Sequence, residues 1–213
     1  LSVGLHSALL AVESSQLAER RGAAARSLAR EAELRALRSQ LNPHFLYNSI
    51  NAVLSLIRSE PKRAERALED LADLFRVLMA DNRALNPLAR EIDIARQYLA
   101  IEELRLGERL RVTWRIDRMP ADALVPALLL QPLVENAVYH GVEPLVEGGE
   151  ITIEVTGSDG RILIRLTNPF RAGADNHAGN RMALANIRER LQLHFDAEAS
   201  LQSRAQGATY EVT

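Results

Sequence analysis

The first half of the chain carries hydrophobic residues at the three- and four-residue spacing that is typical of helices. Residues 13–40 contain no proline and are rich in helix formers, which predicts one long helix. Its leucines have an imperfect coiled-coil spacing, which favours a parallel dimeric signalling helix over the alternative of a solvated single helix. Pro43 then predicts a kink or a restart, because proline lacks a backbone N–H and clashes with the preceding turn.

The next two predicted helices form an antiparallel hairpin. One runs from Pro43 to about Arg58, and Pro61 restarts the other. The second helix carries an apolar stripe at helical spacing, formed by Ala64, Ala67, Leu68, Leu71, Leu74, Phe75, Leu78 and Met79. Such a hairpin leaves a wide apolar face uncovered, and pairing of two copies into a four-helix bundle would bury it. The pattern therefore predicts a homodimer.

A third amphipathic helix is predicted from Leu88 to about Leu106. Gly107 follows it as a natural residue for a helix C-terminus. The stretch from Asp81 to Pro87, which precedes this helix, is the candidate hinge between the hairpin and the rest of the chain. This helix completes a predicted dimerisation region over residues 41–108.

Beyond Gly107 the hydrophobic positions alternate, as they do in half-buried strands. Strands are predicted at 110–116, 150–156, 161–167 and the chain end at 208–213, and the turn Gly157–Gly160 joins the middle two. Pro126 opens a strongly apolar helix over 127–138. A polar loop over 168–179 and a helix over 182–193 follow. The chain is thus predicted to be α+β, with its second domain over residues 109–213.

Composition and charge exclude several classes of function. The 213 residues have a formal net charge of −2 and 47% hydrophobic content, which suits one domain or two small ones. The arginines are interspersed with acids rather than gathered in a stripe, so direct nucleic-acid binding is not expected. The chain has no cysteine, which excludes disulfides and thiolate metal sites.

The first twelve residues are largely apolar, yet a bilayer needs about 20 residues for a spanning helix. We expect residues 1–12 to be the end of a transmembrane helix. Arg20, Arg21, Arg26 and Arg30 follow, as expected on the cytoplasmic side of a membrane. The alternative is a frayed soluble helix.

His44 is the first candidate for chemistry. It follows Pro43 and shares a helix face with Asn48 one turn later, while Phe45 and Ile50 are predicted, with Leu46, to turn toward a core. This spacing presents an imidazole at a helix start. The alternative is a helix-start histidine with no chemical role.

Glu135 and Asn136 are the second candidates, because they lie on the otherwise apolar helix predicted over 127–138. Burying an acid and an amide without partners costs on the order of 1–3 kcal/mol each. They therefore need a ligand, a metal or a structural network, and the residues alone leave these alternatives open.

Three stretches together resemble one family. Asn42 to Asn48 reads N-P-H-F-L-Y-N, which is similar to the phosphoacceptor box of LytS/YehU-type sensor histidine kinases. Leu128 to Gly141 closely resembles the N-box helix of the GHKL ATPase superfamily, and Asn186 to Leu191 resembles the end of its lid motif. Glu91 to Leu110 looks like the segment that joins the hairpin to the ATPase domain in such kinases, and we assign it no chemistry.

The resemblance implies a dimerising helical hairpin followed by a GHKL (Bergerat-type) α/β sandwich with a mixed sheet. It implies an ATP-dependent protein histidine kinase, in which His44 accepts the γ-phosphoryl group and passes it to an aspartate of a response regulator. By the same resemblance the regulator is of the LytTR type. Such kinases lie at the cytoplasmic face of the bacterial inner membrane and are anchored by an N-terminal membrane region.

Carried over residue by residue, the resemblance also implies roles in the site. Asn136 would hold the Mg²⁺ that bridges the ATP phosphates, since hard cations prefer oxygen ligands. His140 would lie near those phosphates. Glu135 would orient the attacking group or accept its proton, because Phe45 follows His44 where other histidine kinases often place an acid.

Two boxes of the family pattern are altered. Asn168 stands where an aspartate usually binds adenine. In the lid box only the first glycine of the pattern is present, as Gly179. Asn180 follows it, and Arg181 and Ala183 stand at the other two glycine positions. Asn168 can still accept a hydrogen bond from adenine, and the Arg181 guanidinium can bind phosphate. The alternative function is a weak or inactive dimeric signalling scaffold, or a phosphatase, with a degenerate ATP lid.

Overall fold

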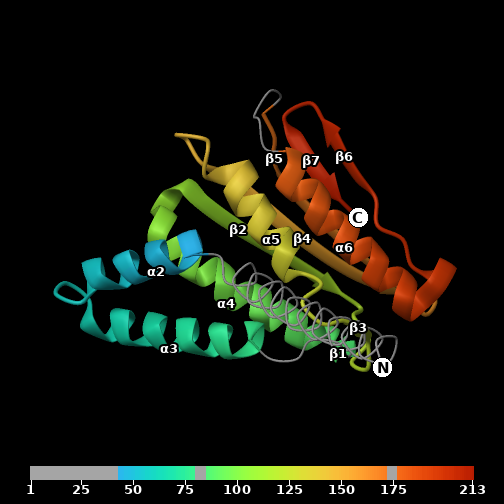
Figure 1. The fold of residues 1–213 in the computed structure, drawn as a ribbon, viewed down its shortest axis with the longest axis horizontal. Coiled ribbons are helices and arrows are strands. Elements are labelled where there is room, and N and C mark those ends of the chain that lie inside the picture. Colours follow the sequence, from blue (N-terminus) through green and yellow to red (C-terminus); the bar gives the residue numbers. More distant parts are fainter. Residues whose placement is uncertain (1–42, 80–84, 172–176) are drawn as a thin grey trace, which may run out of the picture. The chain divides into compact units, whose positions relative to one another are not determined.

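A computed structural model describes residues 43–79, 85–171 and 177–213 of the chain, without the side chains of residues 43 and 177–181 (Figure 1). The chain divides into two units, Leu1–His44 and Phe45–Thr213. The fold described below is that of the second unit. The membrane segment predicted over 1–12 and the long helix predicted over 13–40 lie outside the described residues.

The helical region consists of α2 (Pro43–Leu56), α3 (Pro61–Leu78) and α4 (Leu88–Leu106). Pro61 occupies the first turn of α3, where its missing N–H leaves no hydrogen bond unmade. Gly107 ends α4 with a φ of 58°, in the region that favours glycine. The predicted bounds of α4 are therefore confirmed.

The buried face of α2 differs from the predicted one. Phe45, Ser49 and Val53 are buried at a four-residue spacing, and the Ser49 hydroxyl donates to the Phe45 carbonyl at 2.7 Å. Ile50, predicted to face the core, is 41% exposed. The prediction for Ile50 is wrong because the buried stripe runs one residue away from it, through Ser49, whose hydroxyl is satisfied by its own helix.

The second domain is built on a mixed five-stranded sheet of order β2-β4-β5-β7-β6. Its strands are β2 (Leu110–Asp117), β4 (Gly149–Ser158), β5 (Arg161–Pro169), β6 (Ser203–Gln206) and β7 (Thr209–Val212). β2 runs parallel to β4, and the other pairs are antiparallel. The sequence predicted all of these strands except β6.

Helices cover one face of the sheet (Figure 1). They are α4, the short α5 (Gln131–Asn136), the π-helix η2 (Ala137–Val142) and α6 (His177–Phe195). Ile151, Ile153 and Leu166 of the sheet share one hydrophobic core with Leu99 of α4 and Ile187 of α6. This is the helical hairpin and α/β layer arrangement that the sequence predicted; single-turn helices at Gly107–Arg109 and Asp196–Glu198 complete it.

The opposite face of the sheet carries a ladder of alternating charge, one side chain from each strand. Arg115 pairs with Glu154 at 2.9 Å, Glu154 with Arg165 at 3.1 Å, Arg165 with Glu211 at 3.6 Å, and Glu211 with Arg204 at 2.8 Å. Cross-strand pairs of opposite charge stabilise a sheet modestly and keep its surface hydrated.

The helix predicted over 127–138 is wrong at both ends. Pro126 ends the short strand β3 (Leu124–Pro126) instead of opening a helix, and α5 begins only at Gln131. Leu128 has a φ of 53°, which no helix residue adopts. Beyond Asn136 the chain continues as the π-helix rather than ending at residue 138.

Two further segments contain regular structure that the sequence did not predict. Of the candidate hinge, Leu85–Pro87 forms strand β1, which pairs antiparallel with β3; the rest of the hinge lies outside the described residues. Helix α6 begins at His177, five residues before the predicted start at Met182. The altered lid box is therefore helical along its backbone.

Candidate functional site

The π-helix packs against the end of β5, and a glycine makes this approach close. Gly141 lies so near Asn168 that an added Cβ would overlap the Asn168 amide nitrogen and lie 3.0 Å from the Pro169 carbonyl oxygen. Only glycine fits there without a shift of the neighbouring strand. The structure thus brings Asn168, predicted to bind adenine, against the helical stretch that carries Asn136 and His140.

Asn168 is only 6% exposed, and its orientation is fixed by one hydrogen bond. Its Nδ2 donates to the Pro169 carbonyl oxygen at 2.7 Å. The amide nitrogen therefore faces Pro169 and Gly141, and the amide oxygen lies on the other side of the group as an acceptor. An aspartate at this position could not donate the bond to Pro169.

A single wide turn carries His140. The Glu143 N–H donates to the Val138 carbonyl at 2.9 Å, which is the i to i−5 bond of a π-helix. The rings of Tyr139 and His140 meet edge to face, with centroids 4.9 Å apart. Such π turns are frequent at functional sites, because they displace side chains from the regular helical positions.

Two arginines hold the end of the π-helix. Arg109 Nη2 donates to the carbonyls of Glu143 and Leu145, at 2.9 and 2.7 Å, and so satisfies oxygens that no helical N–H reaches. Arg105 Nη1 forms an ion pair with the Glu143 carboxylate at 2.8 Å. The segment to which the sequence analysis assigned no chemistry therefore fixes the geometry of the π-helix.

Glu135, predicted to orient the attacking group or accept its proton, lies near Glu102 of α4. It accepts a hydrogen bond from Gln131 Nε2 at 3.1 Å. Burial raises the pKa of Glu135, and the nearby Glu102 raises it further, while the bond from Gln131 lowers it. A raised pKa makes the ionised carboxylate a stronger base, which favours its use as a proton acceptor.

Glu91 is a buried acid whose role the sequence analysis missed. It is fully buried on α4, and its carboxylate accepts bonds from the N–H groups of Leu128, Leu129 and Leu130, at 2.8, 2.7 and 3.4 Å. Asn86 Nδ2 adds a fourth bond at 3.2 Å. Glu91 therefore holds the backbone that leads into α5.

Glu102 is the second buried acid that was missed. Its pKa is raised by burial, against the opposing effect of Arg105. A signal for both acids was present, because Glu91 follows Leu88 by three residues and Glu102 follows Leu99 by three, which places them on the apolar side of the helix. An acid at such a position needs a specific partner.

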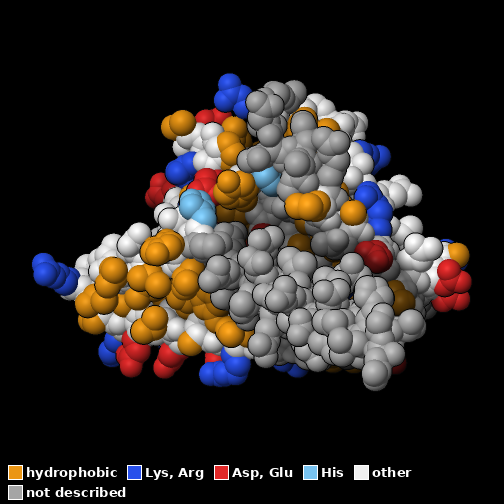
Figure 2. All heavy atoms as spheres, in the orientation of Figure 1, with side chains coloured by type: hydrophobic (Ala, Val, Ile, Leu, Met, Phe, Trp, Pro, Cys, Tyr) orange, Lys and Arg blue, Asp and Glu red, His pale blue; other side chains and the backbone are white. Residues whose placement is uncertain are grey.

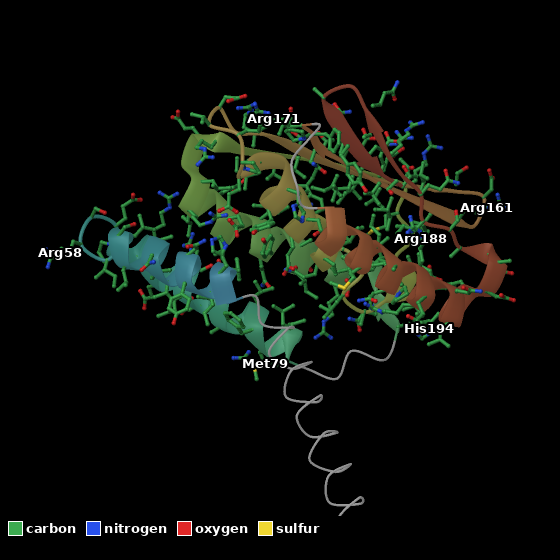
Figure 3. The ribbon with its side chains drawn as sticks, turned by 45° about the horizontal axis from the view of Figure 1, so that its top comes forward. Arg58, Met79, Arg161, Arg171, Arg188 and His194 are labelled. Atoms are coloured by element: carbon green, nitrogen blue, oxygen red, sulfur yellow. The ribbon has the colours of Figure 1, made fainter. Side chains whose placement is uncertain are left out.

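The arginines of the motif Asn186–Leu191 serve the fold. Arg188 of α6, labelled in Figure 3, donates from Nε to the Leu201 carbonyl at 3.2 Å and so ties α6 to the chain leading into β6. Burial lowers the pKa of Arg190, and the nearby Glu91 opposes that effect. This motif therefore braces α6 against its neighbours.

The remaining predicted residues are placed only in part. His44 is exposed in the first turn of α2, as predicted for a presented imidazole. Gly179, Asn180 and Arg181 belong to the first turns of α6, and their side chains lie outside the described ones.

The described residues offer neither a metal cluster nor a membrane span. No group of three or more His, Asp or Glu side chains among them could hold a metal ion unaided. No helix in the described part of the chain has the length and hydropathy of a membrane span.

Comparison with known proteins places these features in a family. Residues 32–110 match the family described as Histidine kinase. The sensor histidine kinase YpdA of Escherichia coli (strain K12) is 36% identical over 193 residues, which cover 85% of this chain and 34% of YpdA. The sensor histidine kinase/phosphatase LytS of Staphylococcus aureus (strain Mu50 / ATCC 700699) is 30% identical over 199 residues, covering 86% of this chain and 34% of LytS.

Among solved structures, the Acinetobacter baumannii histidine kinase AdeS is similar with a TM-score of 0.42 and 17% identity, over 84% of this chain and 94% of that one. The chain spans about a third of the length of the curated relatives that it matches. The family match over residues 32–110 includes the phosphoacceptor box and α4. The chain belongs to the family of LytS-type sensor histidine kinases.

Proposed function

We propose that this chain is the kinase core of a two-component sensor, which binds Mg·ATP and phosphorylates itself on His44. The observation that carries the proposal is the close approach of Asn168 to Gly141, which joins the adenine-box position of β5 to the helix of Asn136 and His140. In this proposal the Asn168 amide oxygen accepts from the adenine amino group, and the phosphates lie toward His140.

Asn136 would supply an oxygen ligand to Mg²⁺, a cation that usually keeps waters and phosphate oxygens as its other ligands. The ion would neutralise charge on the phosphates. One protein oxygen is enough for such a site, so it needs no cluster of acids. Asn136 ends α5, at the junction with the π-helix.

In the transfer step a ring nitrogen of His44 attacks the γ-phosphorus. A P–N bond forms, the bond from the γ-phosphorus to its bridging oxygen breaks, and ADP leaves. The imidazole loses a proton, and we propose the Glu135 carboxylate as its acceptor. Most of the acceleration in such reactions comes from positioning and charge neutralisation. The phosphoryl group would then pass to an aspartate of a response regulator, of the LytTR type by resemblance.

The proposal includes a homodimer formed by helices α2 and α3. Hydrophobic side chains gather on the surface of these helices in Figure 2. The exposed large hydrophobic residues of the hairpin include Tyr47, Ile50, Leu54 and Leu68 on the helices and Ile57 just after α2. An exposed apolar patch of this kind marks an interaction site, and a second copy of the hairpin would cover it as a four-helix bundle. The position at the cytoplasmic face of the bacterial inner membrane rests on the resemblance alone.

A second candidate is a signalling scaffold or phosphatase with weak ATP use. It is favoured by Asn168 in place of an acid and by Arg181 and Ala183 in the lid box. The name of LytS from Staphylococcus aureus includes both activities. Loss of phosphate from a phosphorylated regulator in the absence of ATP would identify a phosphatase.

Thermal unfolding with and without Mg·ATP tests the nucleotide site. Ligands stabilise a protein by binding its folded state, so we expect ATP to raise the melting temperature of the parent and not that of Asn136→Ala. Asn51→Ala, the same change at an exposed position of α2, is the control and should respond like the parent. An unchanged ATP effect in Asn136→Ala would refute the assignment.

A further inference from the structure

A chain of buried contacts begins at the residue next to His44. The Phe45 ring packs on the Tyr98 ring with centroids 4.8 Å apart and an interplanar angle of 32°, and both residues are less than 5% exposed. The Tyr98 hydroxyl donates to Glu102 Oε1 at 3.3 Å. One tyrosine therefore contacts α2 through its ring and a buried carboxylate through its hydroxyl.

The chain continues from Glu102 to the π-helix. Arg105 donates to Glu102 Oε2 from Nε at 2.7 Å, with Nη2 at 2.6 Å, and to Glu143 Oε1 from Nη1 at 2.8 Å. Glu143 directly follows the π-helix, and its N–H closes the last π turn on Val138. One guanidinium thus joins a buried acid of α4 to the end of η2.

These contacts depend on one another because they are largely shielded from water: the side chains of Glu102, Arg105 and Glu143 are 3%, 16% and 25% exposed. Arg105 is shared by two acids, and Glu135 of α5 is a further acid close to Tyr98 and Glu102. A buried charge that loses one partner must find another or shift its position, since water does not replace the bond. A change at Tyr98 or Glu102 should therefore reach Glu143.

We propose that Tyr98 and Glu102 are positioning residues that couple the packing of Phe45 to the geometry of the nucleotide-binding face at Gly141 and Asn168. The inference rests on the proposed function and adds to it a physical link between the helix of the phosphoacceptor and the ATP site. Coupling of this kind is reciprocal: bound ATP favours the packed position of Phe45, and packed Phe45 favours ATP binding.

A double-mutant cycle tests the link. The dissociation constant for Mg·ATP is measured by calorimetry for the parent, Phe45→Leu, Glu102→Gln and the double variant, at a temperature where circular dichroism shows all four folded. Phe45 lies outside the proposed nucleotide site, yet we expect Phe45→Leu to weaken ATP binding about fivefold or more, the lower range of allosteric coupling. In the Glu102→Gln background, Phe45→Leu should change the dissociation constant for Mg·ATP little further.

Two more variants separate positioning from general damage. Tyr98→Phe keeps the ring that contacts Phe45 and removes only the hydroxyl, so it should weaken ATP binding like Glu102→Gln while staying close to the parent in stability. Glu103→Gln makes the same change at the next, exposed position of α4 and should bind ATP like the parent.

The outcomes distinguish the inference from the function on which it rests. If Phe45→Leu leaves ATP affinity unchanged, or if the two substitutions act independently, the inference is overturned while the proposed function stands. If the parent itself does not bind ATP, the proposed function fails and the inference fails with it.

Discussion

Glu135 and Glu102 are carboxyl groups on neighbouring helices, and burial raises the pKa of each above its ordinary value of 4.5. The charge of Glu102 raises the pKa of Glu135 further, so Glu135 holds its proton more tightly in the folded chain than in the unfolded one. A group of this kind favours folding when it is protonated. Its contribution is full below the unfolded pKa and is lost as the pH rises through the folded pKa.

Replacing Glu135 by Gln should therefore change the pH dependence of stability. The variant cannot ionise at this site. Its free energy of unfolding should therefore increase relative to that of the parent as the pH rises above about 4.5. Urea unfolding at several pH values measures the difference. Glu147→Gln, at an exposed position, is the control. A difference between Glu135→Gln and the parent that does not vary with pH would contradict this account.

At the scale of elements, the start of α5 depends on a side chain from another helix. The three N–H groups bound by Glu91 precede α5, and Leu128 among them has a positive φ. A buried carboxylate that accepts several N–H bonds resembles a helix cap supplied from outside the helix. Glu91 thereby sets where the N-box helix begins.

Glu91→Gln should destabilise the fold by about 3 kcal/mol, because one carboxylate oxygen becomes an NH₂ group that faces backbone donors. Thermal or urea unfolding measures the loss. Asp93→Asn, an exposed acid two residues away on the same helix, should stay within about 0.5 kcal/mol of the parent. Equal stability of Glu91→Gln and the parent would show that the four bonds contribute little.

The hydrophobic pattern of the sequence predicted the elements whose structure depends on residues within the element itself. The bounds of α4 follow from its apolar side and Gly107, and β4 and β5 follow from alternation and the turn between them. Strand β6 is polar and mostly exposed, so no alternation marks it; it exists because β7 pairs with it. The π-helix depends on distant partners, Arg105 and Arg109, which no local window contains.

The candidate site was predictable to a similar extent. The motifs singled out His44, Glu135, Asn136, His140 and Asn168, and the structure brings Asn168 against the helix of Asn136 and His140. The contact itself depends on Gly141 and on the register of β5, which are properties of the tertiary fold. The proximity of Glu135 to Glu102 of α4 could not be predicted either, because the two acids are more than thirty residues apart in the sequence.

For the whole molecule, the exposed apolar face of α2 and α3 predicts a dimer. Leu54→Glu places a charge in that face, and each copy of the dimer loses the burial of one leucine, about 1.5–3 kcal/mol. The dissociation constant of the dimer should rise about 100-fold or more. Analytical ultracentrifugation measures it.

The control for this change is Leu163→Glu, an exposed leucine on the sheet face that lies away from the hairpin. It should leave the dimer intact. A parent that is monomeric at all accessible concentrations, or a Leu54→Glu variant that dimerises like the parent, would contradict the four-helix bundle.

The central claim is that His44 receives the phosphoryl group of ATP. Incubation of the protein with Mg²⁺ and ATP labelled in the γ position should give a label that is labile to acid and stable to alkali, as expected of a phosphoramidate. His44→Gln keeps a polar side chain of similar volume at an exposed site, so it should fold and bind ATP like the parent while it takes up no label. Labelling of His44→Gln at the rate of the parent, or no acid-labile label on a parent that binds ATP, would contradict the account.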